Sequence, residues 1–119
     1  MNWFSWFRPK NQGRGNATHG IIEIEIKLVR VVLGHEATEM YWSDVSCIEV
    51  GRKPNTTVDI FYVYLSDNSG NEIYADDLMV RFEKFRDAVF ARWPEIESSW
   101  TSVFNGSPEK AERVEIWKQ

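Results

Sequence analysis

The side chains of this sequence that can do chemistry are few, and the most concentrated of them are carboxylates. Asp76 and Asp77 are adjacent, Glu72 precedes them by one short segment, and Asp59 lies further back. Such oxygens can hold a hard cation or act as a general acid and base, but no matching set of ligands at loop spacing accompanies them. We interpret Asp76 or Asp77 as the cap of a following helix, because a carboxylate accepts hydrogen bonds from free helix amides. A partner-facing acidic patch is the alternative.

Nucleophile and base candidates are sparse as well. His19 and His35 are spaced to pair neither with a carboxylate nor with Cys47. Cys47 occupies a strand-like position, where a thiol is more often a small core residue than a nucleophile. We therefore predict no catalytic residues, no metal site and no cofactor, and a chain that is not an enzyme. A small hydrolase-like enzyme is the least favoured alternative.

The six tryptophans are unusual for a chain of this length. Trp42, Trp93, Trp100 and Trp117 fall where the periodic pattern expects core residues, and each indole N–H needs a partner if it is buried. The core is the first interpretation. The alternative is that a partly exposed Trp100 or Trp117 anchors a binding partner.

The pattern of apolar residues predicts strands before the aspartates. Ile22, Ile24 and Ile26 alternate with charged residues, and the apolar set then changes parity, which predicts a bulge or bend near residues 27–30. Further strands are predicted over residues 38–42, 47–50, 58–65 and 72–75, with a turn at 34–36, a loop at 51–57, and a hairpin joining the last two strands.

Helices are predicted after the aspartates. Apolar residues recur at helical spacing from Phe82 to Trp93, and Pro94 ends the run. A shorter helical stripe runs from Ile96 to Phe104 and is closed by Gly106. Residues 113–118 are typical of a last strand with Val114 and Ile116 facing inward.

Strands followed by helices indicate an α+β fold. We expect a strongly curved antiparallel sheet or partly open barrel, then one long and one short helix and a last short strand. A chain of 119 residues suits one core. Residues 1–20 are predicted to be an aromatic head and flexible linker, and residues 21–119 a single domain.

The head gathers Trp3, Phe4, Trp6 and Phe7, with Arg8 and Lys10 just after them. If it is helical, the four aromatic residues share one arc. One interpretation is a weak membrane anchor, since aromatic and basic residues favour the headgroup boundary. The alternatives are that the head folds back on an apolar patch of the domain, lies in a homodimer contact, or is disordered.

Charge and cysteine content narrow the function classes. The net charge of -4 disfavours nucleic acid, which is bound by clustered Lys and Arg. The single cysteine forbids an internal disulfide and suits a reducing compartment. With neither a secretory segment nor a run of ~20 apolar residues, a cytoplasmic protein is expected.

A resemblance adds to these predictions. It is carried by Trp42-Ser43-Asp44-Val45, Ile48, Val50, Asp59-Ile60-Phe61, Glu72-Ile73-Tyr74, Asp76-Asp77, Phe82, Phe85, Trp93, Trp100 and Trp117. Over about residues 28 to 118 the chain resembles a small uncharacterised bacterial single-domain family that is loosely PH-like. The resemblance implies a compact curved sheet with C-terminal helices and no particular activity, and the aromatic head departs from its pattern.

The function expected from the sequence is a cytoplasmic protein-interaction or accessory module that neutralises or regulates an unidentified protein partner. Acidic residues would steer a basic partner, and exposed aromatic residues would supply affinity. The candidate partner-binding residues are Trp3, Phe4, Trp6, Phe7, Asp76, Asp77, Trp100 and Trp117. A peripheral membrane adaptor that uses the aromatic head is the main alternative.

Overall fold

The computed structural model describes residues 20–53, 59–106 and 113–119, so the predictions for the aromatic head and its linker lie outside the described residues. The strands are β1 (Ile21–Ile24), β2 (Leu28–Leu33), β3 (Glu36–Tyr41), β4 (Cys47–Lys53), β5 (Ile60–Ser66), β6 (Glu72–Asp76) and β7 (Val114–Lys118). The helices are α1 (Phe82–Arg92) and α2 (Glu97–Phe104), with single 3₁₀ turns at Trp42–Asp44 and Pro94–Ile96.

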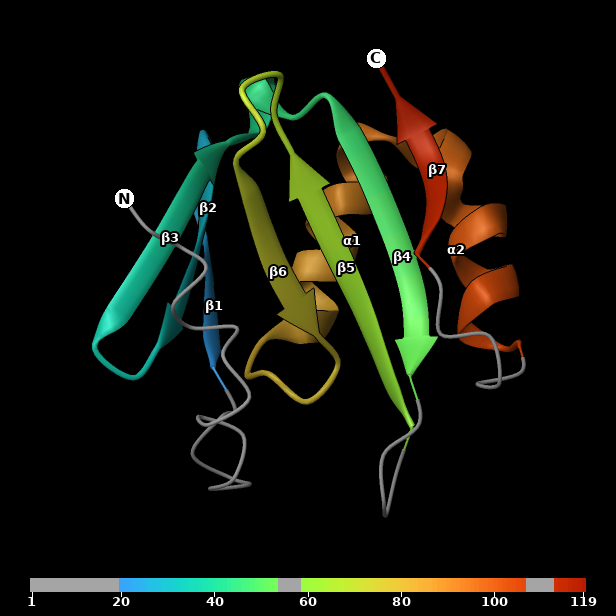
Figure 1. Cartoon of the computed structure of the whole chain (residues 1–119), viewed down its shortest axis with the longest axis horizontal. Coiled ribbons are helices and arrows are strands. Elements are labelled where there is room, and N and C mark those ends of the chain that lie inside the picture. Colours follow the sequence, from blue (N-terminus) through green and yellow to red (C-terminus); the bar gives the residue numbers. More distant parts are fainter. Residues whose placement is uncertain (1–19, 54–58, 107–112) are drawn as a thin grey trace.

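The described strands form two antiparallel sheets. One has the order β1-β2-β3 and the other the order β6-β5-β4-β7, so the last strand returns to pair with β4 (Figure 1). A parallel bridge between Ile21 and Val80 links the edge of the first sheet to the chain that follows β6. The α+β prediction is confirmed, but the strands make two open sheets and no closed barrel within the described ranges.

The change of parity after Ile26 comes from a turn and not from a bulge. Ile24 pairs with Val29 across a tight connection, in which the Glu25 amide donates to the Leu28 carbonyl at 2.9 Å. The indole N–H of Trp42 donates to the Glu25 carbonyl at 3.0 Å and so ties the turn to the core. Where a bulge or bend was predicted near residues 27–30, the chain instead reverses direction. The apolar run is therefore divided into two paired strands, β1 and β2.

The four-stranded sheet is longer than its pattern indicated. β4 continues through Lys53, so residues 51–53, predicted as loop, lie within the sheet. Alternation along β5 sends Phe61, Val63 and Leu65 to one face, where they are at most 1% exposed. Tyr62 and Tyr64 consequently point to the other face.

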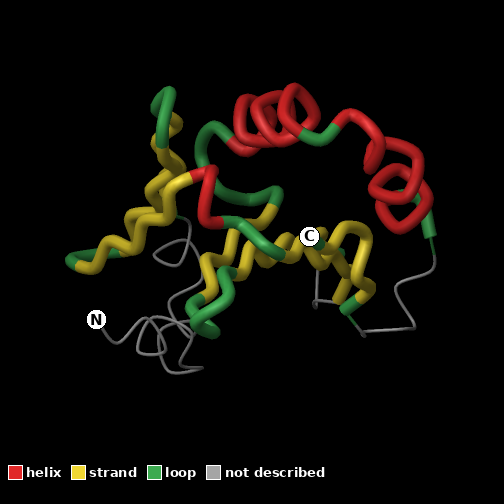
Figure 2. Tube along the Cα trace, turned by 90° about the horizontal axis from the view of Figure 1, so that it is seen from above, coloured by secondary structure: helices red, strands yellow, loops and turns green. Residues whose placement is uncertain are grey.

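The two helices cover the inward face of this sheet (Figure 2). α1 also contacts β1, and α2 contacts β4, so the core lies between the helices and both sheets. Phe85, Val89 and Trp100 are buried from the helix side, and Trp100 packs on Phe61 with ring centroids 5.1 Å apart. Pro94 follows α1, as predicted from its missing amide donor.

The predicted carboxylate cap of α1 is wrong. The residue before the helix is Arg81, in the left-handed conformation with φ 69° and no side-chain cap. Asp76 instead accepts from the Leu78 amide at 3.0 Å, and Asp77 from the Phe61 amide at 3.3 Å. α1 begins five residues after Asp77, which places its free amides beyond the reach of these short side chains.

The end of the described chain is a strand, as predicted. Trp117 on β7 packs against Trp93 with ring centroids 5.2 Å apart, and Ile116 also contacts the core. Val114 was expected to face inward, but it is 45% exposed. The register between β7 and β4 shifts at Ile48/Glu49, and this irregularity changes which residues of β7 reach the core.

Candidate functional site

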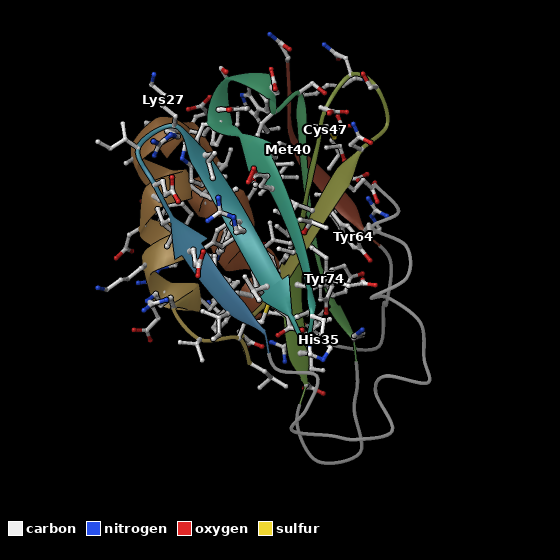
Figure 3. All side chains as sticks on the ribbon, turned by 90° about the vertical axis from the view of Figure 1, so that its left-hand side faces the viewer. Lys27, His35, Met40, Cys47, Tyr64 and Tyr74 are labelled. Atoms are coloured by element: carbon white, nitrogen blue, oxygen red, sulfur yellow. The ribbon has the colours of Figure 1, made fainter. Side chains whose placement is uncertain are left out.

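A cluster of aromatic and charged side chains occupies the outward face of the four-stranded sheet. We call it the tyrosine face and define it by Lys53, Tyr62, Tyr64, Tyr74 and Arg113, with the carboxylates Glu49, Glu72 and Asp76. Figure 3 shows Tyr64 and Tyr74 on the side of the sheet away from the helices. The three tyrosines, Lys53 and Arg113 line a hollow of about 290 Å³.

Strand pairing brings the three tyrosines together. Tyr64 on β5 pairs directly with Tyr74 on β6, and their ring centroids lie 5.3 Å apart. Tyr62 is two residues along β5, on the same face, with centroids 5.7 Å from Tyr64 and 6.2 Å from Tyr74. Three hydroxyls and three aromatic rings thus converge on one area of sheet.

Gly51 makes room for this cluster. It pairs with Tyr62 across β4 and β5, and the Tyr62 ring lies over it. A Cβ at position 51 would come within 2.4 Å of the Tyr62 hydroxyl oxygen. The glycine in the middle of a strand is explained by this close approach of a neighbouring ring.

Two cations lie over the rings. The Lys53 ammonium is 5.6 Å from the Tyr74 ring centroid and 5.9 Å from that of Tyr62. The Arg113 guanidinium carbon is 3.7 Å from the Tyr64 ring centroid. The electron-rich faces of the tyrosines attract positive charge, so this surface already holds two cationic groups from its own chain.

Carboxylates outnumber these cations. Arg113 contacts Glu49 and forms a 2.6 Å ion pair with Glu72. The Tyr74 hydroxyl donates to Asp76 at 2.8 Å. With two cations against three carboxylates, the defined face carries a net negative charge, in agreement with the charge of the whole chain.

Burial raises the pKa of the tyrosines. It raises the pKa of Tyr64 to about 12. The pKa of Tyr74 is raised too, first by burial and then by the nearby Asp76 charge. A tyrosine hydroxyl is neutral at pH 7 even at its ordinary pKa of about 10, and burial makes these hydroxyls harder still to ionise.

A second hollow lies on the helix side. It has a volume of about 820 Å³ between α1 and α2, with Phe90, Trp100 and Phe104 in its lining. Its charged lining residues are Arg81, Lys84, Arg86, Asp77, Glu83, Asp87 and Glu97. With three cations and four carboxylates, this lining gives no clear preference for a ligand of one charge.

The residues predicted to bind a partner separate in the structure. Asp76 belongs to the tyrosine face, whereas Asp77 is half-buried and lines the helix-side hollow. Trp100 is 2% exposed and lies in the core, in agreement with its first interpretation. Trp117 is half-buried against Trp93. Trp3, Phe4, Trp6 and Phe7 lie outside the described residues.

Sequence reasoning did not assign the tyrosines or Arg113 to a site. The signal was present in the alternation of β5, because apolar Phe61, Val63 and Leu65 imply that Tyr62 and Tyr64 share the opposite face. No comparable sequence pattern placed Arg113 on this face. Its position over Tyr64 depends on the return of β7 to the sheet.

The remaining chemical candidates lie apart. His35 is in the turn between β2 and β3. Cys47 is half-buried at the start of β4, its thiol contacts Glu115 at 3.9 Å, and burial raises its pKa. Asp59 pairs with Arg52 at 2.9 Å. Across residues 20–53, 59–106 and 113–119, no three His, Cys, Asp or Glu side chains are grouped so that they could hold a metal ion.

Comparisons with known proteins identify no relative: no family model matches the sequence, and searches of curated proteins and of solved structures found no match. No helix in the described part of the chain has the length and apolar character needed to cross a membrane.

Proposed function

We propose that this protein is a non-enzymatic interaction module that binds a segment of a partner protein on the tyrosine face. The observation that supports the proposal is the convergence of three tyrosines, two cations and three carboxylates on the sheet face opposite the helices. Tyrosine and arginine are enriched at protein interfaces, where a large ring with a polar end supplies both contact area and hydrogen bonds.

The chemistry of the face favours a basic partner segment. The rings already stack with Lys53 and Arg113, and Glu49, Glu72 and Asp76 add negative charge around them. A lysine or arginine from a partner would replace Lys53 or Arg113 over the ring faces and meet the same carboxylates. The same carboxylates would repel the phosphates of a nucleic acid, although aromatic sheet faces bind bases elsewhere.

This binding would neutralise or regulate the partner, as expected from the sequence. Complementary charge between an acidic module and a basic segment speeds association, and buried aromatic contacts then slow dissociation. The protein acts in this proposal by occupying a surface, without chemical change to the partner.

The first test is capture of binding proteins from a lysate of the source cell by the full chain, tagged after Gln119. The matched variants are Tyr64→Ala on the tyrosine face and Tyr41→Ala on β3, where Tyr41 is 50% exposed. We expect a partner that is retained by wild type and Tyr41→Ala and lost with Tyr64→Ala. The purified partner should bind at least ~10-fold more weakly to Tyr64→Ala, the size of effect typical of a central interface residue.

Equal retention of the partner by both variants would contradict the proposal. A parallel arm uses vesicles of anionic and of neutral lipid. Binding to anionic vesicles that disappears in a Trp3→Ala/Trp6→Ala variant, without any protein partner, would favour the peripheral membrane adaptor instead.

A further inference from the structure

The tyrosine face and residues 3–10 have matching chemistry. The face offers aromatic rings bordered by carboxylates. Residues 3–10 supply Trp3, Phe4, Trp6 and Phe7, followed by Arg8 and Lys10. Aromatic rings pack favourably on tyrosines, and basic side chains suit both the ring faces and the carboxylates.

We propose that residues 3–10 bind the tyrosine face of their own chain and compete there with the partner. The competition rests on the proposed function, whereas the intramolecular contact stands on its own. The aromatic segment is then an internal ligand that a partner must displace. Competition from this segment lowers the apparent affinity of the module for its partner.

The connecting chain is long enough for this contact. The Gly20 carbonyl accepts a hydrogen bond from the Val80 amide at 2.9 Å, four residues beyond the end of β6. The first described residue therefore lies close to the end of β6 at which Asp76 pairs with Tyr62. Residues 11–20 can span at most ~35 Å when fully extended, which matches the longest dimension of the molecule, 35 Å.

Tethering makes a weak contact sufficient. A segment joined by a short linker meets its site at an effective concentration in the millimolar range. Even a millimolar intrinsic affinity would then occupy the face for about half of the time. A free partner segment at micromolar concentration must bind correspondingly more tightly to replace it.

The direct test places a nitroxide spin label in the segment of the full-length chain. Ser5→Cys is combined with Cys47→Ser, so that the label attaches at position 5 alone, and backbone amide signals are recorded. We expect strong signal loss at Tyr62, Tyr64 and Tyr74, and little at Lys84, which lines the hollow between α1 and α2. Trp3→Ala/Trp6→Ala in the labelled chain should restore the lost signals.

Two outcomes of this experiment would overturn the inference. One is unchanged signal on β5 and β6, or signal loss concentrated at the hollow between α1 and α2. The other comes from mixing spin-labelled chain with isotope-labelled chain that lacks the label. Signal loss in that mixture that equals the loss within one chain would assign the contact to a second copy.

The competition is tested with a synthetic fluorescent peptide of residues 1–10 added to full-length protein. We expect the Trp3→Ala/Trp6→Ala variant to bind this peptide about 2-fold more tightly than wild type, because the segment that occupies the face for about half of the time no longer competes. Equal affinities would contradict the competition.

The two proposals fail separately. A partner that depends on Tyr64 but binds wild type and Trp3→Ala/Trp6→Ala equally would support the proposed function and overturn the competition. Signal loss at Tyr62 and Tyr74 in a chain whose partner binds Tyr64→Ala normally would support the intramolecular contact and overturn the proposed function.

Discussion

At the scale of single residues, the tyrosine face depends on a position with no side chain. Gly51 leaves the space in which the Tyr62 ring lies, and this ring also packs against the rings of Tyr64 and Tyr74. The packing of the face and the identity of residue 51 are therefore coupled. An added Cβ would force the Tyr62 ring to shift against its aromatic neighbours, which costs packing energy.

We predict that Gly51→Ala lowers the free energy of unfolding by roughly 1–3 kcal/mol, the usual cost of overpacking. Urea denaturation measures this loss. The matched background is Tyr62→Ala, in which the clash is absent and alanine should be at least as stable as glycine in a strand. The same loss in both backgrounds would show that Tyr62 is not the cause.

The pKa of Tyr64 makes stability depend on alkaline pH. Its ordinary value of 10.0 is raised to about 12, mainly by burial. The folded state holds this proton more tightly than the unfolded state, so the contribution to stability is complete below pH ~10 and is lost as pH rises toward ~12.

We predict that wild type loses more stability than Tyr64→Phe between about pH 9 and pH 11.5, because phenylalanine has no proton to lose. Urea unfolding at the two pH values gives the comparison, and the variant corrects for lysine deprotonation. Parallel losses in the two proteins would mean that the Tyr64 hydroxyl ionises normally in the folded state.

At the scale of elements, the start of α1 is a point of strain. Arg81 has φ 69°, in the left-handed region that favours glycine, and no side chain caps the helix there. The chain must turn sharply between the end of β6 and the helix so that Phe82 and Phe85 enter the core. Packing of these rings outweighs the local conformational cost.

We predict that Arg81→Gly stabilises the protein by about 1 kcal/mol relative to Arg81→Ala, because glycine adopts the left-handed conformation without a Cβ clash. Thermal and urea denaturation of the two variants measure the difference. A glycine variant that is less stable than the alanine variant would show that Arg81 is not strained in solution.

Most elements could be predicted from the sequence because their patterns are local. The stripe from Phe82 to Trp93 and the alternation of β5 report the face that each element buries. The turn after Ile24 and the absence of a carboxylate cap on α1 could not be predicted in this way. The first depends on Trp42 bonding to the Glu25 carbonyl, and the second on Asp77 bonding to Phe61, and both are contacts between distant parts of the chain.

The candidate site was predictable only in part for the same reason. Asp76 was predicted as a partner-binding candidate because it belongs to a cluster of carboxylates in the sequence, and it lies on the tyrosine face. Arg113 joins the site through the pairing of β7 with β4, and Lys53 does so because β4 extends beyond its predicted end. Neither the pairing of β7 with β4 nor the extension of β4 can be predicted from the residues adjacent to Arg113 or Lys53.

At the scale of the whole molecule, the two faces of the four-stranded sheet have separate roles. The inward face meets α1 and α2 (Figures 1 and 2) and forms the core. The outward face carries aromatic and charged groups. In the proposed function the folded core holds the tyrosine face rigid, so little ordering entropy is lost when a partner binds.

The most direct measurement is amide chemical-shift mapping of the full-length chain during titration with the partner recovered by capture. The proposal predicts the largest changes at Lys53, Tyr64 and Tyr74, and changes that weaken as salt is raised because the face is acidic. Changes centred on Phe90 and Thr101, with Tyr64 and Tyr74 unaffected, would place binding in the hollow between α1 and α2 and contradict the proposal.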